Sequence, residues 1–99
     1  MLLITGTFRV PPANMEAARS IMAAMVKGSQ AEVGCVHYSY GEDLLDPGLI
    51  HVTEQWSDRA ALEAHWASPH IQRWRAAWPE LGIGERALTL FETDAGAPC

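Results

Sequence analysis

Two runs of alternating residues, 35–42 and 49–56, constrain the fold more than any other feature, because they flank a strong turn signal at Asp46-Pro47-Gly48. In such a turn, proline fixes φ and glycine takes the open backbone position. A period of two is typical of strands whose two faces differ. The runs therefore predict a β-hairpin. In its first strand, one face has Val36, Tyr38 and Tyr40 and the other has Cys35, His37 and Ser39. In its second strand, one face has Ile50, Val52, Glu54 and Trp56 and the other has His51, Thr53 and Gln55.

The segment before the hairpin predicts a strand followed by a long helix. Residues 2–10 are rich in β-branched and aromatic side chains, and Pro11-Pro12 ends that strand because proline cannot donate to a sheet ladder. Asn14 is the expected helix N-cap, and Gly34 marks the turn out of the helix. Apolar residues at helical spacing predict an amphipathic helix on a flat surface: Ala18, Ile21, Met22, Met25 and Val26.

The segment after the hairpin predicts two short helices and a last strand. Ser57 is the expected cap of the first helix, and Ser68 with Pro69 begins the second. Pro79 is expected to end that helix, and the last strand spans 86–93. The order β-α-β-β-α-α-β predicts an α+β chain of ferredoxin-like arrangement, with four antiparallel strands and the helices on one face. We expect one domain over 1–94 and a disordered tail over 95–99.

Composition and charge indicate which classes of partner the protein can have. The net charge of −5 and the scattered Lys and Arg argue against nucleic acid. With 48% apolar residues, a chain of 99 residues favours an oligomer with a shared core. The N-terminal segment resembles neither a signal peptide nor a membrane span, so we expect a soluble, cytoplasmic protein with no membrane partner. Cys35 and Cys99 do not make a disulfide framework, and we interpret them as a small buried residue and a loose terminal thiol.

The stretch 61–74 carries the most suggestive chemistry. It places His65 on the inner face of a helix just before the break at Ser68-Pro69, and His70 at the start of the next helix. We expect no metal, because the two histidines are five residues apart across a proline and no H-E-x-x-H or paired-cysteine spacing exists. A zinc ion bridging His37 and His51 on the more polar sheet face is the remaining metal hypothesis.

An ordered set of short motifs resembles the antibiotic biosynthesis monooxygenase family across nearly the whole chain: Gly34-Cys-Val-His-Tyr38, Asp46-Pro47-Gly48, Glu54-Gln-Trp-Ser-Asp58, Ala64-His65 and Ser68-Pro-His70. The resemblance implies a monomer that dimerises through its sheet into an α+β barrel, with a pocket between sheet and helices. Members include cofactor-free monooxygenases of phenols and quinols, haem-degrading enzymes and an isomerase of a phosphorylated signal. Haem chemistry fits poorly, because Arg75 and His65 stand where the haem-degrading relatives have histidine and tryptophan.

His65 matches the family's pocket histidine and is our candidate catalytic base, because histidine titrates near neutral pH. The alternative is a half-buried histidine that holds its helix to the sheet. Glu54 is the second catalytic candidate, since a carboxylate on an apolar strand face needs a partner. It could orient His65 or a substrate hydroxyl, or it could pair structurally with Arg75, Arg9 or a backbone amide.

The remaining candidates would bind substrate: Tyr38, Tyr40, Trp56, Trp66, His70, Trp74 and Arg75. Tyrosine and tryptophan rings suit a flat aromatic ligand, with core or interface packing as the alternative. His70 could instead bond a backbone carbonyl. Arg75 lies on the Ile71/Trp74/Trp78 face, where it could snorkel outward or offset an anion.

These residues predict a homodimeric, cofactor-independent monooxygenase that oxidises a small aromatic or quinol-like substrate with dioxygen. The substrate supplies the electrons, so the scheme needs no flavin. An isomerase of a small carbonyl compound and a non-catalytic small-molecule-binding stress protein remain alternatives. Oxygen consumption separates the first alternative, and ligand affinity that survives His65→Ala separates the second.

Overall fold

The computed structural model describes residues 1–99. Its helices and strands follow the predicted order: β1 (Leu2–Arg9), the 3-10 turn η1 (Pro12–Asn14), α1 (Met15–Gln30), β2 (Cys35–Glu42), β3 (Leu49–Trp56), α2 (Arg59–Trp66), α3 (Pro69–Leu81) and β4 (Gly84–Glu92). None of the helices is both long and apolar enough to cross a membrane.

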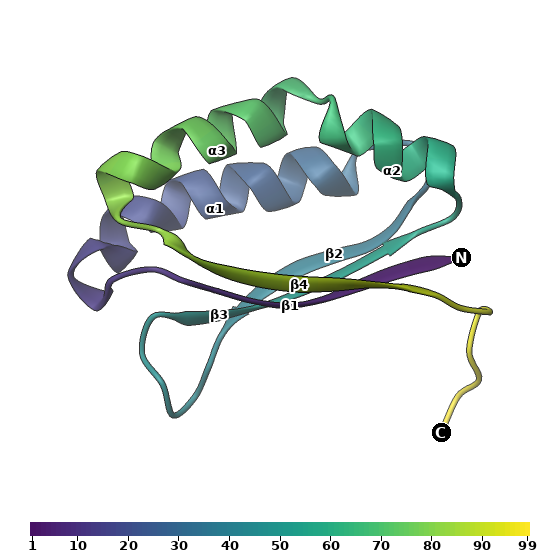
Figure 1. The fold of residues 1–99 in the computed structure, drawn as a ribbon, viewed down its shortest axis with the longest axis horizontal. Coiled ribbons are helices and arrows are strands. Elements are labelled where there is room, and N and C mark those ends of the chain that lie inside the picture. The colour runs from purple at the N-terminus through teal and green to yellow at the C-terminus, as the bar shows by residue number, and fades with distance from the viewer.

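The four strands form one antiparallel sheet in the order β2-β3-β1-β4. All three helices cover the same face of the sheet, and the opposite face is bare (Figure 1). The hairpin β2–β3 is present as predicted, and β1 lies between β3 and β4. The structure therefore confirms the ferredoxin-like α+β fold.

The core lies between the helices and the covered sheet face and contains 16 buried apolar residues. Strand alternation supplies the sheet side, because every second residue of a strand points to the same face. Leu2, Ile4 and Phe8 of β1 thus face the helices, where Ala18 and Leu62 are fully buried. This packing holds α1 and α2 on the covered face of the sheet.

A β-bulge at the start of β2 corrects one predicted face. Cys35 pairs with Trp56 and His37 with Gln55, so Val36 is the extra residue of the bulge. One extra residue reverses the alternation before it. Cys35 therefore packs against the core, whereas Val36 is 52% exposed, and its predicted place beside Tyr38 is wrong.

Two predicted helix boundaries also differ. Asp58, not Ser57, caps α2, and its Oδ1 accepts the backbone N–H of Ala61 at 2.8 Å. α3 runs past Pro79 to Leu81 and ends at Gly82, whose φ of 67° closes the helix. The C-terminal cap, in which Gly82 N–H donates to the Pro79 carbonyl and Ile83 N–H to the Trp78 carbonyl, ends the helix instead of Pro79.

Candidate active site

A cavity of about 730 Å³ opens between the sheet and helices α2 and α3. Its walls are mostly apolar and include Phe8, Val52, Ile71 and Leu88, which come from three strands and one helix. Cavities of this size and character suit a drug-sized organic ligand. The polar groups that converge on these walls therefore define the candidate site.

His65 is the central polar group. It projects from α2, is 1% exposed and lines the cavity. Its ring lies 4.5 Å from that of Trp56, centroid to centroid, and 5.5 Å from that of Tyr38. Burial lowers the pKa of His65, and its hydrogen bond to Glu32 partly opposes this. The imidazole is therefore neutral at neutral pH, the form that can accept a proton.

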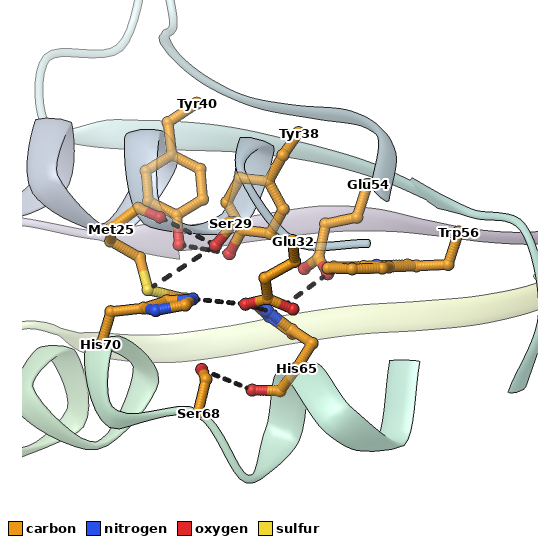
Figure 2. Close-up of polar contacts among 10 residues, drawn as sticks. All are labelled: Met25, Ser29, Glu32, Tyr38, Tyr40, Glu54, Trp56, His65, Ser68 and His70. Atoms are coloured by element: carbon orange, nitrogen blue, oxygen red, sulfur yellow. Dashed lines mark hydrogen bonds and ion pairs between the residues drawn. The ribbon is translucent and has the colours of Figure 1, made fainter. Parts of the chain in front are cut away.

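Glu32 holds His65 from the loop between α1 and β2. Its Oε1 lies 3.0 Å from His65 Nδ1, and the same oxygen also bonds His70 Nε2, so the carboxylate stands between the two rings (Figure 2). We assign the proton of neutral His65 to Nδ1, since a carboxylate only accepts. That assignment leaves Nε2 as the basic nitrogen, 3.9 Å from Glu54 Oε1.

Glu54 lies on β3 with only 5% of its surface exposed, and it also lines the cavity. The indole N–H of Trp56 donates to its Oε1 at 3.1 Å. Burial raises the pKa of the Glu54 carboxyl, and this hydrogen bond partly offsets the rise. Its polar neighbours are thus Trp56 and His65, whereas Arg9, one suggested partner, pairs with Asp46 and Glu85.

Tyr38 and Tyr40 lie on the same face as Glu54, as predicted, because Tyr38 pairs directly with Glu54 and Tyr40 with Val52. Their hydroxyls are 2.9 Å apart, and both rings line the cavity. Burial raises the pKa of each phenol above its usual value. Both hydroxyls therefore stay protonated near neutral pH, and because one donates to the other, the pair has one O–H left to donate to a ligand oxygen.

The other predicted binding residues divide into two groups. Trp66, Trp74 and Arg75 line the cavity. Trp56 and His70 do not: the ring of Trp56 packs against His65, and His70 bonds Glu32. Trp56 thus contacts His65 directly, and His70 shares the carboxylate that holds it.

Three charged residues of the site were not predicted: Glu32, Arg59 and Arg86. Glu32 lies just before the turn glycine Gly34, and no periodicity or motif distinguishes it from a surface carboxylate. Arg86 could have been found from strand alternation, because Arg86, Leu88 and Leu90 lie two apart on β4 and all line the cavity. Arg59 reaches the cavity from the first turn of α2.

The site also contains a set of metal-ligand atoms. One atom each of Glu32, His65 and His70 lies within 4.8 Å of the others, an arrangement that could hold a divalent ion. Hydrogen bonds join all three side chains. The hypothesis of a zinc ion across the hairpin finds no matching geometry, because His37 pairs with Gln55 while His51 pairs with Gly41.

Comparisons with known proteins identify relatives of this chain. The sequence profile of the family described as antibiotic biosynthesis monooxygenase matches residues 1–77. Putative monooxygenase Rv0793 of Mycobacterium tuberculosis is 33% identical over 88 residues, which cover 89% of this chain and 86% of the relative. An uncharacterised Synechocystis protein, sll1783, is 28% identical over 80 residues, and this chain spans only about half of it (54%).

Solved structures agree in fold. The structure of Rv0793 matches with a TM-score of 0.82 at 30% identity and covers 98% of both chains. The structure of a Deinococcus radiodurans protein described as a putative antibiotic biosynthesis monooxygenase matches with a TM-score of 0.91 at 24% identity. It covers 100% of this chain and 98% of its own, and at that identity the likeness concerns the fold alone. Together with the profile match, these findings show that the chain belongs to the antibiotic biosynthesis monooxygenase family.

Proposed function

We propose that this protein is a cofactor-independent monooxygenase that oxidises a small or polycyclic quinol or phenol with dioxygen. The observation that carries the proposal is the orientation of His65. Its Nδ1 is engaged by Glu32, and its ring is buried and neutral at the wall of an apolar cavity. A histidine so held can act as a general base in the way that a carboxylate-oriented histidine does in other enzymes.

In this scheme, His65 Nε2 takes the proton of a substrate hydroxyl. The resulting anion gives one electron to dioxygen, and the substrate radical and superoxide then combine to form a C–O bond. The imidazolium returns its proton to the peroxide anion, and the hydroperoxide loses water to leave a new carbonyl. A naphthol plus O₂ would thus give a naphthoquinone plus H₂O, with one oxygen atom in each product.

The cavity supports this chemistry without a cofactor. Apolar walls exclude water and favour electron transfer from the desolvated anion. The hydrogen-bonded pair Tyr38 and Tyr40 supplies one neutral hydroxyl donor, and Glu54 can hydrogen-bond the reacting oxygen. Trp66 and Trp74 offer flat surfaces for an aromatic ring.

The test is oxygen uptake by the metal-stripped protein with a panel of naphthols, hydroquinones and polyphenols. Wild type would be compared with His65→Ala and His65→Gln, and with His51→Ala as a control, since His51 is exposed and bonds only Asp43. Uptake above autoxidation that collapses in both His65 variants but survives in the control supports the proposal. Circular dichroism confirms that each variant is folded.

No uptake by wild type with any substrate would refute the oxygenase and favour an isomerase or a non-catalytic binder. Uptake that His65→Ala and His65→Gln leave unchanged would refute His65 as the base. Because His65→Gln keeps the size of the side chain and a polar group near Glu32, its loss of activity would separate base chemistry from packing.

We also propose that the protein acts as a homodimer joined through the uncovered sheet face. In support, the helices leave that face bare (Figure 1), and Phe91 on β4 is 48% exposed. Light scattering at micromolar concentration should give twice the chain mass of 10.8 kDa. A monomeric mass would refute this assembly.

A further inference from the structure

Three arginines surround the cavity and set its charge. Arg59 comes from α2, Arg75 from α3 and Arg86 from β4, and all three line the cavity. They are three of only seven Lys and Arg residues in a chain with a net charge of −5. Cations are therefore concentrated at the cavity of an otherwise acidic protein.

Two of these arginines have no carboxylate partner. Arg75 and Arg86 form no ion pair within 4.0 Å, whereas Arg9, outside the cavity, contacts both Asp46 and Glu85. Arg59 pairs with Glu63 at 3.5 Å and lies 5.2 Å above the ring of Trp66. These contacts leave the guanidinium groups of Arg75 and Arg86 available to a ligand.

The one carboxyl group that lines the cavity, that of Glu54, is outnumbered by the three guanidinium groups. Glu54 is buried, and burial raises the pKa of its carboxyl, which favours the neutral acid. The cavity thus offers positive charge and hydrogen-bond donors in excess of negative charge.

Trp78 supplies an aromatic part of the cavity wall next to Arg75. Its indole Nε1 is the one buried side-chain nitrogen or oxygen without a hydrogen-bond partner, and Trp78 lines the same cavity. Arg75 lies three residues before it on α3, so the two side chains are neighbours on one helix face. Because the indole Nε1 has almost no accessible surface, a ligand in the cavity cannot reach it, and Trp78 contributes its ring face to the wall instead.

We propose that the cavity binds an aryl carboxylate: a flat aromatic body against the apolar walls, including Trp78, with its carboxylate held by Arg75 and Arg86. Arginine suits this ligand because its planar guanidinium matches a carboxylate with two parallel hydrogen bonds. The inference deepens the proposed function and rests on it for the phenolic substrate, which would carry its reacting hydroxyl toward His65. Arg75 and Arg86 would then determine specificity rather than take part in the chemistry.

The test compares 6-hydroxy-2-naphthoate with its neutral amide by isothermal titration calorimetry. Wild type should bind the acid at least about tenfold more tightly than the amide, the difference expected from one charge-assisted interaction. The double variant Arg75→Gln/Arg86→Gln should reduce that preference to within about threefold. Arg73→Gln is the matched control, because Arg73 is an exposed arginine of the same helix that does not line the cavity, and it should retain the preference.

Equal affinity for acid and amide in wild type would overturn the inference. An equal loss of preference in Arg73→Gln would also overturn it, because the effect would then come from the general field of the protein. Both substituted side chains are exposed, so thermal melts should match wild type and exclude misfolding.

Calorimetry separates this inference from the proposed function because binding needs no oxygen. Preference for the acid without oxygen uptake on any carboxylated naphthol would support the anion subsite and refute the monooxygenase. Oxygen uptake on neutral naphthols, with acid and amide bound equally, would support the monooxygenase and refute the subsite.

Discussion

Replacing Glu32 by glutamine removes the charge that orients His65 while preserving the shape of the side chain. One oxygen of Glu32 accepts hydrogen bonds from both His65 Nδ1, at 3.0 Å, and His70 Nε2. Charge-assisted hydrogen bonds contribute about 1.5–3 kcal/mol, and neutral ones about half as much. The loss at His65 is thus about 1–1.5 kcal/mol, and we expect kcat/KM on a phenolic substrate to fall about tenfold.

The pH profile gives a second, more specific readout. Glu32 raises the pKa of His65 against the larger, lowering effect of burial. Removing the carboxylate charge should therefore lower this pKa further. Since the neutral imidazole is the active base, the acidic limb of kcat/KM should move to lower pH in Glu32→Gln.

Steady-state oxygen uptake across pH 4–9 measures both effects. Glu16→Gln is the matched control, because Glu16 is an exposed glutamate whose side chain pairs only with Arg19, and neither residue lines the cavity. An acidic limb that stays in place, or shifts equally in the control, would refute the role of Glu32 as the positioning residue of His65. If activity falls in Glu32→Gln but the acidic limb of kcat/KM stays at the same pH, the role of Glu32 is purely structural.

Three further predictions concern stability. Leu62→Ala, at a fully buried position, should lower the free energy of unfolding by about 2–5 kcal/mol in urea titrations, and a loss below about 1 kcal/mol would contradict the packing described. Gly6→Ala should cost at least about 3 kcal/mol, because the added Cβ would lie 1.9 Å from the carbonyl oxygen of Ala87, whereas Gly41→Ala meets nothing within 4 Å and should leave Tm nearly unchanged. Because the pKa of His65 is lowered in the folded state, the unfolded chain binds a proton at this histidine more readily than the folded chain does. The free energy of unfolding should therefore fall as pH drops below about 6.5, by at most about 1.4 kcal/mol per pH unit. Urea titrations from pH 7 to 5 should show a flatter dependence of this free energy on pH in His65→Gln, and an equally steep dependence would contradict the assignment.

Local sequence signals were sufficient to predict the element order. Apolar residues repeat every second position in the strands and near every fourth position in the helices, and prolines and glycines separate these segments. All of these signals come from residues that are close together in the sequence. Asp46-Pro47-Gly48 and Pro11-Pro12 therefore lie at the strand ends, as predicted. The bulge at Val36 could not be predicted, because it depends on how Cys35 and His37 pair with a strand twenty residues away.

The candidate site was predictable only in part. His65, Glu54, Tyr38 and Tyr40 stood out as polar groups on apolar faces, and the structure gathers all four at one cavity. Their roles in substrate binding and catalysis stay predictions. Glu32 could not be predicted, because its importance comes from a hydrogen bond that spans 33 residues of sequence.

The sequence by itself determined the order of helices and strands, the buried faces apart from the start of β2, and the main polar candidates, because periodicity and turn chemistry are local properties. Only the tertiary structure decided which charged groups meet. Docking of α2 on the sheet places His65 beside Glu54, and the α1–β2 loop brings Glu32 to its other nitrogen. The same docking closes a cavity whose arginines come from α2, α3 and β4. Electrostatic contacts of this kind depend on distance in space, which chain position alone does not fix.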